Sequence, residues 1–143
     1  MILKTPLKIA LATLGALTIA AAQTSSEPVL TNLSTAHWTH DKGDPPGSES
    51  VLLRRDAQTG SLELLVRFPA GHVISPHWHD ANERIIVLEG QLTAKRDGGS
   101  TVLDSGGFAF LPSKEVQRLS CTSTIRCTFY IAWDAKPGSH PAP

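Results

Sequence analysis

The chain has 143 residues, which suits one domain, and its 13 basic and 13 acidic residues give a formal net charge of zero. This balance provides no basic surface for nucleic acid and no acidic tract that would solvate a disordered region, so we expect no nucleic-acid partner. With 41% hydrophobic residues, the composition is that of an ordinary globular domain.

Residues 1–22 are predicted to be a signal peptide that is removed on export. Lys4 and Lys8 precede an apolar run over residues 9–20, and the three alanines at residues 20–22 form a small-residue cleavage pattern. The alternative is a transmembrane anchor, which would need about 20 apolar residues, and this run is shorter. We therefore expect a periplasmic or secreted protein with no membrane span after cleavage.

The rest of the chain divides into a lead-in, one β domain and a tail. Residues 23–35 are mostly polar and form the lead-in, and residues 36–135 form the predicted domain. Residues 136–143 contain three prolines and one glycine, and they are predicted to be a disordered tail.

Within the domain, short extended segments alternate with turn signals. Residues 61–68 place Leu62, Leu64, Val66 and Phe68 on one face, as a half-buried strand requires. Turn signals recur about every eight to twelve residues and no long helical period is present, which predicts an all-β sandwich or barrel. The predicted strands cover residues 36–40, 51–55, 61–68, 73–79, 84–89, 91–96, 100–103 and 108–111, followed by two strands that carry the cysteines.

The two cysteines, Cys121 and Cys127, flank five residues that resemble a tight connection between two strands. If these strands pair around Thr124, the cysteines lie opposite each other, as a cross-strand disulfide requires. Counting by two from Cys127 places Phe129, Ile131 and Trp133 on the same apolar side. The alternative is a pair of buried free thiols. Because an oxidising compartment permits a bridge, we expect the disulfide.

His77, His79 and Glu83 form the candidate site. Two histidines separated by one residue in an extended segment point to the same side. Glu83 can fold back beside them if the chain turns at residues 80–82, whose composition suits a turn. Two imidazoles and one carboxylate form a facial ligand set for a divalent metal, with open positions for water or substrate.

The other histidines and Trp78 are predicted to lie outside this pocket. His72 has the opposite parity to His77 and His79. The remaining histidines occur in loop-like contexts, where solvated polar side chains are expected: His37, His40 and His140. Trp78 alternates outward between the two candidate ligands and is expected to be a packing residue.

These spacings resemble those of a known family. The first signature motif of the cupins, which are small double-stranded β-helix (jelly-roll) barrels, is similar in every spacing to a set of five residues here: Gly71, His77, His79, Glu83 and Gly90. The resemblance covers roughly residues 50–133 and implies an all-β jelly-roll fold.

The second cupin signature is matched only in its first half. A glycine, Gly106 or Gly107, is followed by an apolar strand and proline over residues 108–112, as in the family. This chain then has Lys114 where the family usually has glycine, and Gln117 where it has its last histidine.

Carried over residue by residue, the resemblance implies that His77, His79 and Glu83 are metal ligands, with Gln117 in the fourth place. An amide oxygen is a harder and weaker ligand than imidazole, so Gln117 lowers affinity for zinc or copper. One divalent ion is implied, and iron, manganese, zinc, nickel and copper are not distinguished. The alternative is a barrel that has lost its metal and keeps the polar cluster as a small-molecule pocket.

Together with the predicted signal peptide, the resemblance implies an exported metal-binding cupin that binds a small-molecule ligand. If the chain is an enzyme, dioxygenase or isomerase chemistry is implied, without a choice between them. One alternative is a non-enzymatic small-molecule or metal sensor, because Trp38 and residues 44–47 resemble the entry of cupin sensor domains in zinc-dependent anti-sigma factors. Another is an ion that only stabilises the barrel.

A homodimer is also expected. In the strand that follows Glu83, Ile85 and Val87 share the inward parity, whereas Ile86 and Leu88 face the other way. An outer face with two large aliphatic side chains needs cover from another sheet or from a second copy of the chain.

Overall fold

The computed structural model describes residues 28–143, so the predicted signal peptide, residues 1–22, lies outside the described residues. Within the described range, no helix is long and apolar enough to cross a bilayer. The described residues form ten strands: β1 (Glu49–Arg55), β2 (Leu62–Phe68), β3 (His77–Trp78), β4 (Glu83–Glu89), β5 (Leu92–Arg96), β6 (Gly99–Leu103), β7 (Phe108–Leu111), β8 (Gln117–Cys121), β9 (Cys127–Trp133) and β10 (His140–Pro141).

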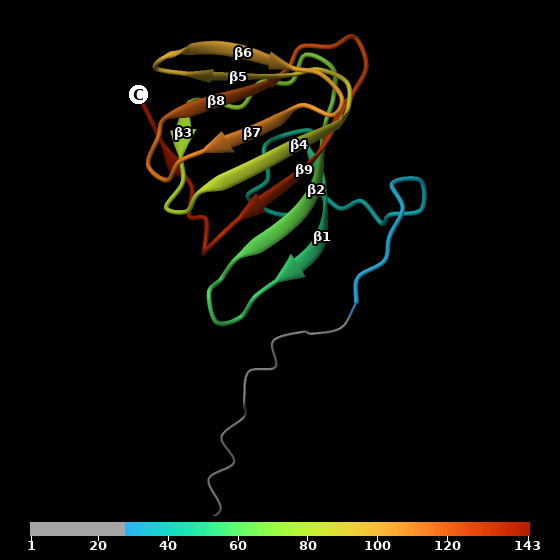
Figure 1. Ribbon diagram of the computed structural model, residues 1–143. Helices are drawn as coiled ribbons and strands as arrows, with labels where there is room; N and C mark the ends of the chain where they lie inside the picture. The colour runs from blue at the N-terminus through green and yellow to red at the C-terminus, as the bar shows by residue number, and fades with distance from the viewer. Residues whose placement is uncertain (1–27) are drawn as a thin grey trace, which may run out of the picture.

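The strands form two five-stranded antiparallel sheets that face each other (Figure 1). One sheet has the order β1-β2-β9-β4-β7, and the other has the order β10-β3-β8-β5-β6. Strands that follow one another in the chain often lie in different sheets, as β3 and β4 or β8 and β9 do. This interleaving is that of a jelly roll, so the predicted all-β, double-stranded β-helix fold is confirmed.

Two predicted strands are shorter than expected. In residues 36–40, only Thr39 pairs, through an isolated bridge with Ser50. In residues 73–79, His77 and Trp78 form β3, and Val73 makes an isolated bridge with Ser120. Residues 36–40 therefore only touch a sheet edge, whereas residues 73–79 join a sheet through the two residues of β3.

The core lies between the two sheets, where alternate residues of the strands meet. Its most buried apolar side chains come from both layers: Ile85, Val87, Leu92, Leu119, Cys121, Cys127 and Phe129. Full burial of one large aliphatic or aromatic side chain stabilises a fold by about 1.5–3 kcal/mol. This core therefore fixes the register of the strands that carry the candidate site.

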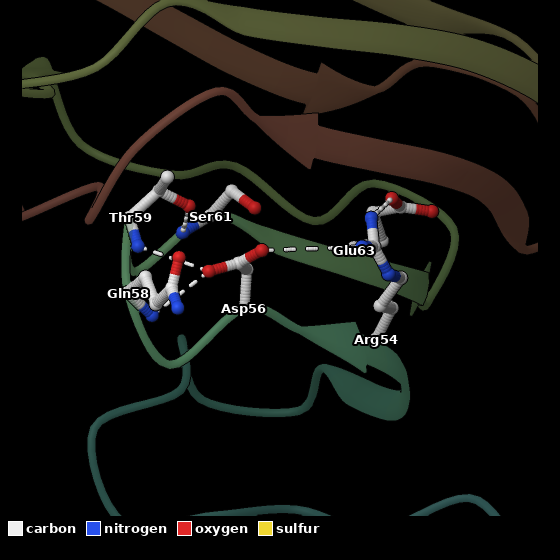
Figure 2. A network of polar contacts seen from close by, with 6 residues as sticks. All are labelled: Arg54, Asp56, Gln58, Thr59, Ser61 and Glu63. Atoms are coloured by element: carbon white, nitrogen blue, oxygen red, sulfur yellow. Dashed lines mark hydrogen bonds and ion pairs between the residues drawn. The ribbon is translucent and has the colours of Figure 1, made fainter. Parts of the chain in front are cut away.

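The β1–β2 connection is held by a polar network (Figure 2). Asp56 Oδ1 accepts hydrogen bonds from the backbone N–H groups of Gln58, at 2.8 Å, and Thr59, at 3.0 Å. Arg54 lies 3.5 Å from Glu63 across the strand pair, and 3.9 Å from Asp56. An aspartate that bonds the backbone just after it is a recurrent turn device, and here it sets where β2 begins.

The predicted disulfide between Cys121 and Cys127 is present, with a Cα–Cα distance of 5.6 Å. The predicted hairpin around Thr124 is wrong, because β8 pairs with β3 and β5 whereas β9 pairs with β2 and β4. The residues between the cysteines carry the chain from one sheet to the other. The bridge therefore links the two layers of the barrel.

The C-terminal segment, residues 136–143, differs from the disordered tail that its composition predicts. His140 and Pro141 form β10, which pairs with β3, and Figure 1 shows the C-terminus beside that strand. The His140 ring stacks on Trp78 with centroids 3.9 Å apart, and its Nε2 lies 2.8 Å from Asp80 Oδ2. These contacts with the β3 region give the segment its order.

Candidate functional site

The strands bring the four candidate residues together. His77 lies in β3 opposite Gln117, the first residue of β8, and Glu83 is the first residue of β4. Gln117 Nε2 donates a hydrogen bond of 2.6 Å to Glu83 Oε2, and His79 Nε2 lies 3.3 Å from the same oxygen. The ring centroids of His77 and His79 are 5.0 Å apart. Contacts from residue to residue therefore connect all four.

Both histidine rings are oriented by backbone carbonyls. The Nδ1 atom of His77 lies 2.8 Å from the carbonyl oxygen of Ser75, and that of His79 lies 2.5 Å from the carbonyl oxygen of Gly138. A carbonyl can only accept, so each Nδ1 carries the proton, and Nε2 of the neutral ring keeps its lone pair. Metal-binding histidines are usually held in this way.

Glu83 is a buried acid whose protonation state changes with pH near neutrality. Its side chain is 1% exposed, and this burial raises its pKa to about 7, although the Gln117 hydrogen bond acts in the opposite direction. Burial also lowers the pKa of His79. Because neutral His79 has no proton on Nε2, its contact with Glu83 is favourable when the carboxyl group carries the proton.

The donor chemistry of the cluster fits a cation. Glu83 Oε1 and Gln117 Oε1 are buried and have no hydrogen-bond partner. A buried oxygen that lacks a donor is costly, and a cation could satisfy it. As the side chains lie, however, no group of three or more His, Cys, Asp and Glu residues within 28–143 is placed to hold a metal ion. The donors contact one another instead of surrounding a common point.

The cluster opens onto a cavity of about 320 Å³ between the two sheets, lined by His77, His79 and Glu83 among others. Residues 43–45 and the C-terminal residues Ser139 and Pro141 also contribute to its lining. Gln117 is 3% exposed, is hydrogen-bonded to Glu83 and does not belong to this lining. A small molecule in the cavity would therefore meet the two histidines and the acid before the amide.

Two groups of the site were not predicted from the sequence to belong to it. Trp133 lines the cavity with its ring centroid 5.3 Å from that of His79. Its indole N–H has no hydrogen-bond partner of standard geometry, yet it lies near enough to Glu83 to lower the pKa of that carboxyl group, against the larger effect of burial. The parity that places Trp133 on the inner side was the available signal. For the carbonyl of Gly138, no sequence signal existed.

The remaining histidines follow the expectation in part. His72 does not line the cavity; its ring packs on Phe68 with centroids 4.7 Å apart. His37 is exposed, and His40 bonds the carbonyl oxygen of Ser48. His140 differs from a freely solvated loop residue, because it stacks on Trp78 and joins β10.

Solved structures with this fold include several cupin-type proteins. The polyketide cyclase RemF from Streptomyces resistomycificus is 17% identical, with a TM-score of 0.66 over 82% of this chain and 87% of that one. Oxalate oxidase in complex with the substrate analogue glycolate is 18% identical, with a TM-score of 0.62, and the alignment covers 83% of this chain and 66% of that one.

A chain in the crystal structure of Rhodobacter sphaeroides SigE with the anti-sigma ChrR is 16% identical, with a TM-score of 0.57. That alignment covers 72% of this chain and 52% of the other. At these identities, the likeness demonstrates the fold alone.

No curated protein matches this sequence. The family model for the ChrR cupin-like domain matches residues 26–135, which is most of the chain and includes every candidate site residue. The chain therefore belongs to the ChrR cupin-like domain family of the cupin superfamily.

Proposed function

We propose that this chain is an exported cupin that binds a divalent metal ion through His77, His79 and Glu83 and holds a small molecule beside it. Gln117 is the fourth, weaker ligand or the residue that orients Glu83. The bound molecule is either held unchanged or transformed, as in a dioxygenase or isomerase.

The observation that supports this proposal most directly is the state of the two imidazoles. Each Nδ1 atom is hydrogen-bonded to a backbone carbonyl, so Nε2 of each neutral ring keeps its lone pair, and Nε2 of His79 lies 3.3 Å from the buried Glu83 carboxyl group. An acid and two oriented bases inside a ligand-sized cavity are costly to bury unless they bind something.

When bound, a divalent ion would polarise an oxygen atom of the ligand as a Lewis acid. The protein's own residues have separate tasks. Gly138 and Ser75 hold the imidazole orientations through their carbonyl groups. Gln117 donates to Glu83 Oε2, which fixes the carboxyl group and leaves Glu83 Oε1 free of hydrogen bonds.

Export is supported by two independent features. The N-terminal sequence has the pattern of a signal peptide. The Cys121–Cys127 disulfide is also of the kind that persists in oxidising compartments and is rare in the cytosol. We therefore place the folded domain in the periplasm or outside the cell.

A non-enzymatic sensor is the second candidate, and family membership favours it. The matching model describes the cupin-like domain of ChrR, and a neighbouring structure contains ChrR as an anti-sigma factor bound to SigE. In a sensor, occupancy of the site would change a contact with a partner without turnover of the ligand.

Metal content of purified protein tests the proposal. We expect about one equivalent of a divalent metal by elemental analysis of protein isolated from its own compartment. His77→Ala and His79→Ala should abolish stoichiometric metal, because each removes an imidazole ligand. Gln117→Ala should weaken binding only in part, since an amide oxygen is the weaker donor.

The control is His37→Ala, which removes an exposed histidine remote from the cavity lining and should leave metal content unchanged. Wild-type protein that takes up no divalent metal would contradict the proposal. Complete loss of metal from the Gln117 variant would show that the ranking of ligands is wrong.

A further inference from the structure

Most of the cavity wall is apolar. The residues that face it from β2, β8 and β9 are aliphatic or aromatic: Leu64, Val66, Leu119, Phe129 and Ile131. Apolar walls favour a ligand that transfers apolar surface out of water, and they offer no hydrogen bonds to a sugar or another polyhydroxylated molecule. The body of the ligand should therefore be hydrocarbon.

The titratable polar groups of the wall include one connected cluster, in which His79 contacts both His77 and Glu83, and Trp133 packs beside His79. Serine side chains also line the cavity: Ser48, Ser50, Ser75 and Ser139. One polar group on the ligand can be satisfied by the cluster, whereas most of the remaining wall is hydrocarbon. An oxygen atom on the ligand can bind a metal ion, and it can also accept a hydrogen bond from an N–H or O–H group.

The charge of the lining argues against a dianion. No lysine or arginine lines the cavity in the described part of the chain, whereas Asp44 adds a second acidic side chain to Glu83. The divalent ion proposed above would bring two positive charges, which the acidic side chains of Glu83 and Asp44 offset. A dicarboxylate or a phosphate ester would then have no fixed cationic side chain to balance it, and burying an unbalanced charge is unfavourable. The ligand should carry at most one negative charge.

The volume sets an upper size. An apolar cavity of about 150 Å³ can hold benzene. This cavity, at about 320 Å³, is roughly twice as large. It has room for one or two rings, or for a chain of similar bulk.

From these observations, we infer that the cavity binds a small, mainly apolar molecule of one or two rings that carries an oxygen-bearing group. This inference deepens the function proposed above and rests on it, because the oxygen would meet the His77–His79–Glu83 cluster. The lining selects against dicarboxylates and sugars.

A series of four probes tests the inference by isothermal titration calorimetry on metal-loaded and chelator-treated protein. 1-Indanone has two rings and one carbonyl oxygen, indane lacks the oxygen, oxalate is a dianion, and glucose is polyhydroxylated. We expect 1-indanone to bind at least about tenfold more tightly than oxalate or glucose, and several-fold more tightly than indane, a difference typical of one hydrogen bond.

A matched pair of variants tests whether binding occurs in this cavity. Leu64 lines the cavity, whereas its partner in the β1–β2 register, Leu52, is 54% exposed and lies outside the lining. Leu64→Trp should fill the cavity and weaken 1-indanone binding about tenfold or more, with metal uptake unchanged. Leu52→Trp should alter neither.

The outcomes separate this inference from the proposed function, and the wild-type series decides even if Leu64→Trp does not fold. Metal uptake together with preferred binding of oxalate or glucose would overturn the inference and leave the metal proposal intact. No detectable binding of 1-indanone at millimolar concentration would overturn the inference as well. Binding of 1-indanone without metal uptake would support the inference and contradict the metal proposal.

Discussion

Glu83 links the chemistry of the site to the stability of the fold. Its pKa in the folded protein is about 7, raised from the ordinary value of 4.5 by burial. Between these pH values the folded state holds a proton that the unfolded state has lost. In metal-free protein, stability should therefore fall as pH rises from about 4.5 through 7, by an amount on the order of 3 kcal/mol. Urea unfolding across this range measures the change.

Glu83→Gln is the variant that isolates this contribution, because glutamine has a similar shape and does not titrate. The depressed pKa of His79 acts in the opposite direction, since its contribution to stability is lost as pH falls below about 6.5. The difference between wild type and Glu83→Gln should thus depend on pH even where the two effects partly cancel. Parallel curves for the two proteins would exclude the titration of Glu83 in this range.

Two glycines of the cupin signature differ in what fixes them. Gly71 and Gly90 both have left-handed backbone, with φ of 76° and 79°. A Cβ at Gly90 would lie 2.6 Å from the carbonyl oxygen of Arg126 and 3.1 Å from Cα of Cys127, whereas one at Gly71 would meet nothing within 4 Å. Gly71 is thus required by conformation alone, and Gly90 by conformation and close packing.

Gly90→Ala should therefore destabilise the protein more than Gly71→Ala. The left-handed conformation costs a non-glycine residue about 1–2 kcal/mol, and this is the expected loss for Gly71→Ala. Gly90→Ala must also displace backbone atoms, so we expect a loss on the order of 3 kcal/mol. Chemical denaturation of both variants measures this, and equal losses would contradict the role of the Arg126 contact.

The C-terminal segment acts as one element of the site. It pairs with β3 through β10, provides the carbonyl of Gly138 to His79, and contributes Ser139 and Pro141 to the cavity lining. Asp80 N–H also donates to the carbonyl oxygen of Pro137, at 2.6 Å. The loop that carries His79 is therefore held from the C-terminal side as well as by β4.

Deletion of residues 136–143 should weaken metal binding about 10- to 100-fold, because His79 Nδ1 loses its acceptor and the ring is no longer oriented. The barrel should still fold, since β10 is a two-residue strand at the edge of its sheet. Titration with metal and circular dichroism measure the two effects. Deletion of Pro143 alone is the control, and equal metal affinity for the two truncated proteins would show that the segment has no role in the site.

The elements differ in how far sequence could predict them. Strands such as β2 and β4 were predictable because a period of two is a local property of the chain. The same property placed His77 and His79 on one side of their segment. The connection over residues 122–126 was different, because its turn-like sequence fits both a hairpin and a crossing between sheets. Only the packing of the whole barrel decides between these.

The order of the C-terminal segment was not predictable for a related reason. Its proline and glycine content is typical of a disordered tail, and the contacts that order it are distant in the chain. His140 and Asp80, for example, are 60 residues apart. Trp78 could be predicted to point outward, but nothing local indicated that His140 would cover it. Non-local contacts of this kind override composition.

At the scale of the whole molecule, the cavity depends on both sheets. His77 and Leu119 come from the sheet that contains β3 and β8, whereas Leu64, Glu83 and Ile131 come from the facing sheet. The Cys121–Cys127 disulfide links the two layers where the chain crosses between them. The disulfide and the core contacts that hold the two sheets together therefore also set the width of the cavity.

The outer face of β4 and β7 remains a candidate interface between copies of the chain. Ile86 and Leu88 are 40% and 37% exposed, and Phe108 and Phe110 on the neighbouring edge strand are 58% and 46% exposed. Ile86 lies directly opposite Phe108 in the β4–β7 register, so these side chains form one apolar patch. An apolar patch that includes an edge strand is prone to pair with another chain.

We therefore expect a homodimer at micromolar concentration, with this patch at its centre. The double variant Ile86→Lys/Phe108→Lys should shift the protein to monomer, because two or more buried lysines would lack partners at the interface. Leu52→Lys is the matched control, since Leu52 is 54% exposed on β1 at the opposite edge of the same sheet. Sedimentation equilibrium measures the mass of each protein, and a monomeric wild type would contradict the dimer, whereas a dimeric double variant would place the interface elsewhere.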